Sequence, residues 1–504
     1  MNTFKRKALS VAVLGGLGAV AGTAHAVYQD PSGNGQVLLY PYYTVQQAGG
    51  NSYNTYISVV NTTTRGKAIK VRFREGKNSR EVLDFNLFLS PNDVWTGAVV
   101  PADATTSSAG RLVTADTSCT NPAIPTAGID FRNYAYVGAQ ADNAGSGVDR
   151  TREGYLEMLE MATVNNVAPL NALTAITHTA NGVPANCAAV QTTTLAVTAP
   201  AGTFTAPSGG LNGSYTLINV NNGADLGGNA HAFSNFRSTA GYTDIGDETY
   251  NLSSGDPVSV VVSTQPTGTT AYLATFTNPV DAVSATMMHS NVINEYALDT
   301  STRSNTDWVM TFPTKRFYVT ATAATTPFTN KFTATGACEL ISFTYFNREE
   351  SGATAALSDF SPSLPGVSDA LCWESTVVSI RNGVAHTAGT TSGVLGSVNF
   401  QPINVRSGFQ NGWANLLFTG TNAATVGITS LAGAGLSNAI NVNTGAAATT
   451  AQNYRGLPVI GFMARTLFNG TLSCTSTTGS SASCQGSYGS LYDHKYLQVI
   501  TPAP

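Results

Sequence analysis

Apolar and polar residues alternate with a period of two along much of the chain, which is the pattern of half-buried β-strands. The clearest runs lie at 53–61, 68–74, 82–89 and 94–99. Gly66-Lys67 and Gly76-Lys77-Asn78 supply turn residues between the first three runs. We therefore predict that these three runs pair as an antiparallel meander, with the fourth run beside them.

Further strands are predicted at 154–161, 214–220, 258–262, 271–276, 308–312, 316–320, 339–346, 372–380, 457–467 and 491–499. One helix is predicted at 285–298, because Met288, Val292 and Tyr296 recur at helical spacing. The crossovers that a parallel sheet requires are not apparent. The predicted fold class is mainly β, with antiparallel β-sandwich-like lobes, one or a few short helices and long polar loops.

The N-terminus has the organisation of a secretory signal peptide. Lys5, Arg6 and Lys7 precede an apolar run at 8–21, and small residues follow as Thr23-Ala24-His25-Ala26. We expect residues 1–26 to be removed and the mature chain to begin near Val27. No later apolar stretch reaches the length of a membrane helix, so we expect no transmembrane segment in the mature chain. The predicted location is extracellular or at the cell surface, with the periplasm as the alternative.

Composition predicts an almost uncharged polar surface, and one biased segment suggests a division into two β-rich regions. Charged residues make up 11% of the chain, against about 25% in ordinary soluble domains. A biased segment at 320–327 is the best candidate boundary, and it divides the mature chain into an N-terminal β-sandwich-like region with inserted loops, 27–320, and a C-terminal β-rich region, 331–504. The formal charge is −4, which lacks the basic footprint of nucleic-acid binding.

Six cysteines lie in the exported part, at Cys119, Cys187, Cys338, Cys372, Cys474 and Cys484. An even number in an oxidising compartment indicates disulfides. Six cysteines allow several connectivities, and loop closure favours neighbours, namely the first with the second, the third with the fourth and the fifth with the sixth. No C-x-x-C spacing suggests zinc, so we predict no metal and no cofactor.

Seven basic residues crowd into one short stretch of this charge-poor chain: Arg65, Lys67, Lys70, Arg72, Arg74, Lys77 and Arg80. On a strand, Lys70, Arg72 and Arg74 share one face. We call these three residues the basic ladder. One interpretation is a solvated sheet face balanced by Glu75, Glu81 and Asp84. The other is a contact surface that docks onto an acidic partner, either a neighbouring copy or a component of the cell envelope.

Candidate catalytic chemistry is sparse, and the sequence contains none of the common nucleophile, metalloprotease or nucleotide-binding motifs. Glu157 and Glu160 are three positions apart, so on a strand they face opposite ways and cannot flank one glycosidic bond. We expect both to be ordinary exposed residues. A second acidic group lies at 244–248. The segment 142–149 carries oxygen ligands and glycines, but it lacks the phase of a calcium loop and reads as a solvated turn.

Three segments, 35–43, 71–85 and 307–316, resemble a group of uncharacterised exported proteins of Gram-negative bacteria. The resemblance would extend over most of the chain. It implies export and a β-rich surface protein, and it carries no assigned activity or site residues.

The expected function is that of a secreted, non-enzymatic structural or interaction protein of the cell surface or extracellular matrix, which associates with itself or with envelope components. The first alternative is a polysaccharide-binding module with Trp95, Trp308, Trp373 or Trp413 as an aromatic platform. The second is a secreted hydrolase. For self-association, the segment 36–43 is the expected donated edge, so removal of residues 27–43 should leave a folded monomer.

Overall fold

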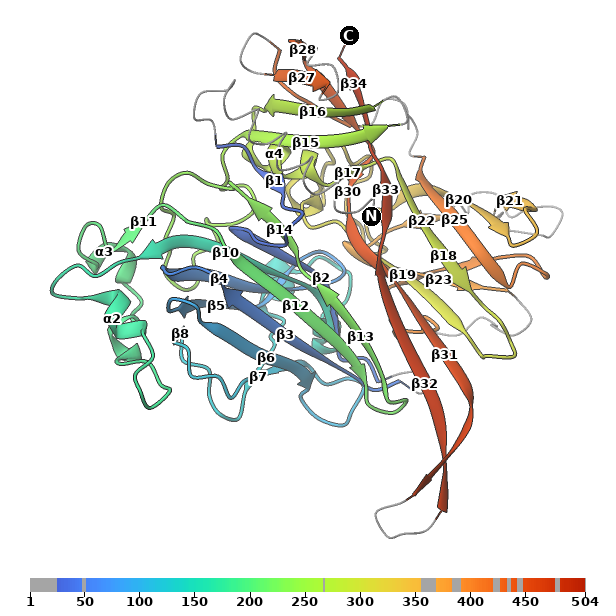
Figure 1. Cartoon of the computed structure of the whole chain (residues 1–504), viewed down its shortest axis with the longest axis horizontal. Coiled ribbons are helices and arrows are strands. Elements are labelled where there is room, and N and C mark those ends of the chain that lie inside the picture. The colour runs from blue at the N-terminus through green and yellow to red at the C-terminus, as the bar shows by residue number, and fades with distance from the viewer. Residues whose placement is uncertain are drawn as a thin grey trace.

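The computed structural model describes residues 25–47, 51–265, 268–354, 369–382, 391–419, 427–432, 437–441, 447–475 and 481–503. Within these ranges the protein is mainly β and is built from several sheets whose strands pair almost entirely antiparallel (Figure 1). The one parallel pair among the described strands joins β23 (Ser375–Arg381) to β24 (Phe400–Asn404). The predicted fold class is therefore confirmed. The helices of the described part are short: α2 (Ala172–Ile176), α3 (Leu195–Thr198) and α4 (Pro279–Thr286).

Two sheets from the N-terminal half face each other. The first has the order β1 (Tyr28–Gln29), β14 (His231–Ser234), β2 (Val37–Thr44), β10 (Glu153–Val164), β4 (Gly66–Glu75), β5 (Glu81–Leu89) and β8 (Thr120–Asn121), with β11 (Phe204–Thr205) on β10. The second has the order β13 (Ala224–Asn229), β12 (Leu211–Asn219), β3 (Tyr53–Asn61), β6 (Val94–Pro101), β7 (Gly110–Val113) and β9 (Ile129–Asp130). Val71 and Phe85 of the first sheet share a core with Val59 and Trp95 of the second.

The C-terminal half contributes two larger sheets. The third sheet runs β21 (Gly352–Thr354), β20 (Glu339–Asn347), β25 (Asn411–Phe418), β18 (Asn291–Ala297) and β33 (Lys495–Leu497), with β22 (Ala370–Leu371) on β20. The fourth runs β24, β23, β19 (Asn305–Thr311), β31 (Ile460–Thr475) and β32 (Ser481–Asp493). Trp308 of the fourth sheet packs on Phe343 of the third.

Three smaller groups of strands complete the sheets. One joins β15 (Val258–Gln265), β16 (Gly268–Thr275), β27 (Ser437–Asn441) and β28 (Ala447–Ala448). Another joins β26 (Gly427–Thr429), β29 (Gln452–Arg455) and β34 (Val499–Pro502), and β17 (Met288–His289) pairs with β30 (Leu457–Pro458). Among the described residues, no helix is both long and apolar enough to span a bilayer.

The predicted meander is wrong in its partners. β4 and β5 form the expected antiparallel hairpin, but β3 pairs with β12 and β6 in the second sheet. The chain therefore crosses from one sheet to the other between β3 and β4 and returns between β5 and β6. Alternation identifies which side of a strand is buried, but it carries no information about which sheet the strand joins.

The division of the chain at 320–331 is not followed by the sheets. β16 pairs with β27, β18 pairs with β25, and β19 pairs with β31, so residues from 268 to 311 belong to sheets built with the C-terminal strands. Sheet membership changes instead between β14 and β15. The cause is that strands distant in sequence supply the hydrogen-bonding partners, which local composition cannot reveal.

The helix predicted at 285–298 is also a correction. Only its first two residues lie in α4, and β17 and β18 follow. Met288, Val292 and Tyr296 are buried at a spacing of four. That spacing keeps residues on one face of a strand as well as one face of a helix, so the pattern does not separate the two structures.

Two of the expected disulfides are formed, Cys119–Cys187 and Cys338–Cys372. The first joins the residue before β8 to η4 (Cys187–Ala189), in the long segment between β10 and β11. The second joins the residue before β20 to the residue after β22. The side chains of Cys474 and Cys484 lie outside the described residues, so the third pairing stays a prediction. The segment 1–24 also lies outside the described residues.

The segment 36–43 is not a donated edge. It forms most of β2, which lies between β14 and β10, and every residue of this strand is buried. The expectation that residues 27–43 can be removed from a folded monomer is therefore wrong. An all-apolar run such as Val37-Leu38-Leu39 is typical of a strand covered on both sides.

Candidate functional site

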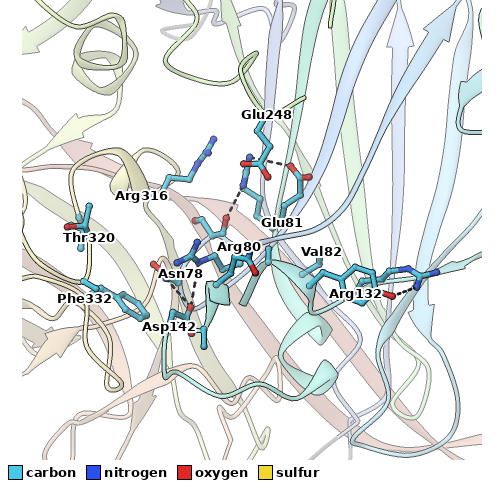
Figure 2. A pocket seen from close by; sticks show the side chains of 18 of the residues that line it. Asn78, Arg80, Glu81, Val82, Arg132, Asp142, Glu248, Arg316, Thr320 and Phe332 are labelled. Carbon is cyan, nitrogen blue, oxygen red and sulfur yellow. Dashed lines mark hydrogen bonds and ion pairs between the residues drawn. The ribbon is translucent and has the colours of Figure 1, made fainter. Parts of the chain in front are cut away.

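Charged side chains line a cleft, most of it on the N-terminal half of the described chain. It has a volume of about 830 Å³ and lies between β5 with its preceding turn, the chain around η1 (Tyr134–Tyr136), and the segment that follows η5 (Lys315–Phe317) (Figure 2). Four arginines and four carboxylates line it: Arg74, Arg80, Arg132, Arg316, Glu81, Asp84, Asp142 and Glu248. The formal charges of these eight side chains balance.

Arg74 and Arg316 meet at one carboxylate on the deep side of the cleft. Arg74 Nε donates to Glu157 Oε2 at 3.0 Å, and Arg316 Nη2 lies 3.2 Å from Glu157 Oε1. Burial alone would raise the pKa of Glu157, but Arg316 and Arg74 hold that pKa below its usual value. Because Arg316 follows β19 and Glu157 lies on β10, this cluster joins the N-terminal sheet to the C-terminal half of the protein.

Arg72 and Lys70 are satisfied by the chain that covers β4. Arg72 Nε lies 2.9 Å from Glu81 Oε2, and its Nη1 donates to the Tyr250 carbonyl oxygen. Lys70 Nζ donates to the Asp244 carbonyl oxygen at 2.9 Å. Burial lowers the pKa of Lys70 to about 8.

The basic ladder is therefore not a contact surface. The exposed fractions of Lys70, Arg72 and Arg74 are 0%, 0% and 3%. The three residues do share one face, and Glu81 does balance them across the strand, but the loop between β14 and β15 lies over that face. Both interpretations from the sequence assumed solvent there. The basic ladder is instead part of a buried cluster of ion pairs and hydrogen bonds. Its cations have partners because an unpaired charge in the interior is costly.

The two acids singled out by spacing are buried as well. Glu157 and Glu160 have exposed fractions of 0%, so the prediction of ordinary exposed residues is wrong. They face opposite sides as predicted, because Glu157 bonds Arg74 whereas Glu160 accepts from Lys67 Nζ at 2.9 Å. Each carboxylate is committed to a cation on its own side of the sheet.

The segment 142–149, which the sequence predicts to be a solvated turn rather than a calcium loop, folds around an arginine. Arg150 donates to both oxygens of Asp142, at 2.7 and 2.6 Å, and also to Glu75. Arg150 thus occupies the acceptor sites that a calcium ion would need. Among the described residues, no group of three or more His, Cys, Asp or Glu side chains is placed to hold a metal.

The Asp142–Arg150 pair predicts an acid-labile contribution to stability. Burial opposes ionisation of Asp142, but hydrogen bonds from Arg150 and Asn78 lower its pKa from 3.8 to about 2. A carboxylate with a lowered native pKa stabilises the fold above its ordinary pKa, and this stabilisation is lost as the pH falls from about 4 to 2. We expect Asp142→Asn to flatten the pH dependence of the unfolding midpoint in that interval. An unchanged slope in this variant would contradict the assignment.

The described lining of the cleft contains neither histidine nor cysteine, so its carboxyl groups are the candidates for proton transfer near neutral pH. Burial raises the pKa of Glu81, and Asp84 and Glu248 raise it further. On the deep side, burial raises the pKa of Glu374 to about 7, and Ser79 Oγ donates to Glu374. A raised carboxyl pKa beside other carboxylates is the feature a hydrolase would use, but Arg72 and Arg74 both hold Glu81 in ion pairs.

Sequence reasoning missed Arg316, Arg150 and Glu374. Arg316 and Glu374 reach β10 and the turn before β5 from distant segments, so no local spacing marks them. The sequence gives one hint of these distant partners. The cations on and near β4 outnumber the acids of the same hairpin, so a buried basic ladder needs carboxylates from elsewhere in the chain.

The tryptophans do not form one platform. Trp95 and Trp308 are fully buried, whereas Trp413 has an exposed fraction of 42%. Trp373 is half-buried and lies beneath the ammonium group of Lys77. Only Trp413 is placed to meet a large ligand.

The β31–β32 hairpin projects well beyond the body of the protein (Figure 1). β19 pairs with β31 only as far as Thr466, whereas the β31–β32 ladder continues to the Thr475–Ser481 pair. We call residues 469–475 and 481–487 the arm. Among the described strands, those of the arm pair only with each other, so neither outer edge of the arm is paired with a third described strand.

Comparison of the chain with models of protein families, with curated proteins and with solved structures finds no match.

Proposed function

We propose that this protein is an exported, non-enzymatic interaction protein of the cell surface or extracellular matrix, and that it associates with further copies through the arm. The supporting observation is the projection of a two-stranded hairpin with two open edges. An open edge gains most by pairing with another strand, and a second arm provides one with matching twist and length.

The chemistry of the arm favours such pairing. The sequence from Leu467 to Tyr492 contains no charged residue. Natural proteins commonly protect solvent-exposed edges with lysine, proline or bulges, and an uncharged edge lacks the most effective of these safeguards. Two arms can therefore approach without electrostatic repulsion, which is consistent with assembly of identical chains.

The base of the hairpin is anchored, so that the arm is presented in a fixed direction. Gly489 of β32 lies against the backbone of Asp225 and the side chain of Leu226 in β13, with no room for a larger side chain. Tyr488 and Tyr492 stand beside this contact with exposed fractions of 53% and 48%. A rigid base reduces the entropy that an interaction through the arm must overcome.

Edge charges provide the test. We expect the double substitution Gln485→Lys and Ser487→Lys to weaken self-association by about tenfold or more, because lysines on an edge oppose pairing with a second copy. The matched control, Thr106→Lys with Ser107→Lys, adds the same charge at exposed loop positions and should associate like the unaltered chain. Sedimentation velocity measures both. Equal association of the two variants would contradict the proposal.

A further inference from the structure

Trp413 presents a preorganised aromatic surface on the outer face of the third sheet. It lies directly across from Phe346 of β20, and the two rings stack with centroids 4.6 Å apart and planes inclined by 14°. With 42% of its surface exposed, the indole has one side fixed by Phe346 and area left for a ligand. Stacking fixes the orientation of the ring without covering it.

The surroundings of Trp413 supply hydrogen-bonding groups of both kinds. A hollow of about 520 Å³ adjoins the ring, and its charged lining consists of Glu295, Arg348, Glu350 and Lys495. Two acids and two bases leave it with no net charge. Asn347 adds an amide group at the same hollow. Donors and acceptors are thus mixed around one aromatic surface.

The same face continues as a polar track along the sheet. The register places Thr344 of β20 opposite Asn415 of β25, and Asn415 lies opposite Ile293 of β18. Thr354 lies opposite Thr344. This row runs beside the row that holds Phe346, Trp413 and Glu295. Three of its four side chains, those of Thr354, Thr344 and Asn415, are short and polar, and the row ends at the apolar Ile293.

We propose that this face binds a neutral polysaccharide, with a pyranose ring stacked on Trp413. A sugar ring has an apolar C–H face that fits an indole, and hydroxyl groups that both donate and accept hydrogen bonds. The balanced charges of the hollow give no long-range attraction to a polyanion or polycation. This binding face is separate from the arm. Saccharide binding would therefore be a second function, by which the self-associated protein also binds a polysaccharide.

Intrinsic fluorescence provides the experiment, since Trp95 and Trp308 are buried and Trp413 is the most exposed indole of the chain. The mature protein is titrated with dextran and with a soluble β-glucan. We expect a change in emission and protection from acrylamide quenching. Trp413→Ala should weaken binding by about tenfold or more, and Phe346→Ala should weaken it less.

Controls separate binding from folding and from self-association. Tyr134→Ala removes an aromatic ring with an exposed fraction of 66% at the charged cleft and should bind saccharide normally. Trp413→Phe should retain part of the binding. The double variant Gln485→Lys with Ser487→Lys, which we call the arm lysine variant, should bind saccharide like the unaltered chain. The proposal is overturned if neither polymer affects emission, if Trp413→Ala binds equally well, or if protection of Trp413 depends on protein concentration alone, which would identify a second copy as the occupant.

Discussion

Replacing Glu157 by alanine is expected to reduce the free energy of unfolding by about 3–5 kcal/mol, the cost of removing one partner from a buried ion pair. Glu157 has an exposed fraction of 0% and receives hydrogen bonds from both Arg74 and Arg316. The alanine variant leaves two guanidinium groups facing each other without their shared counter-charge. Urea unfolding of the disulfide-bonded chain measures the loss.

The Arg111–Asp130 pair is the matched control. Its atoms lie 2.5 Å apart, but the two side chains have exposed fractions of 34% and 48%. Because solvent screens such a pair, Asp130→Ala should cost much less than Glu157→Ala. Equal losses of unfolding free energy in Glu157→Ala and Asp130→Ala would contradict the burial of the ion pairs at Glu157 and would favour a solvated basic ladder.

Deleting residues 27–43 is expected to abolish folding. The deletion removes nearly all of β2, whose eight residues are all buried, and leaves β10 and β14 without their common partner. Removal of a central strand exposes the apolar faces on both sides of the first sheet, and its cost exceeds the ~5–15 kcal/mol of stability available to a typical domain.

Circular dichroism and limited proteolysis of the deleted chain measure this outcome directly. The matched variant shortens the chain at the arm, by replacing residues 469–486 with a two-residue Asn-Gly turn. That variant should remain folded, since the arm strands pair only with each other among the described strands. A folded, cooperative 27–43 deletion would place the N-terminal segment at an edge and contradict the described sheet order.

Much of the β architecture was predictable because burial on one side of a strand produces a local pattern. The runs at 53–61, 68–74 and 82–89 coincide closely with β3, β4 and β5. Disulfide partners were predictable for the same reason, since short loops close at lower entropic cost. The alternation of a strand is set by adjacent residues, and each of the two disulfides joins a cysteine to the next cysteine along the chain.

The candidate site depended on contacts that no local pattern records. The even-numbered positions of β4 carry Lys70, Arg72 and Arg74, which alternation assigns to solvent. Carbonyl groups of a loop far along the chain, at Asp244, Asp247 and Tyr250, accept hydrogen bonds from Lys70 and Arg72. Arg74 is bonded instead to Glu157 and to the Ser79 carbonyl oxygen. Alternation therefore identified the shared face of the three cations but not its surroundings. Arg316, which shares Glu157 with Arg74, comes from η5, outside the first sheet.

Self-association through the arm is tested most directly by hydrogen exchange of its backbone amides as a function of protein concentration. Within a hairpin, half of the amides of each strand point outward and are unpaired in a single chain. We predict that the outward amides of residues 481–487 exchange freely in dilute protein and become protected as the protein associates, while those of the arm lysine variant stay unprotected. Exchange that is independent of concentration, in a protein that remains monomeric, would contradict the account.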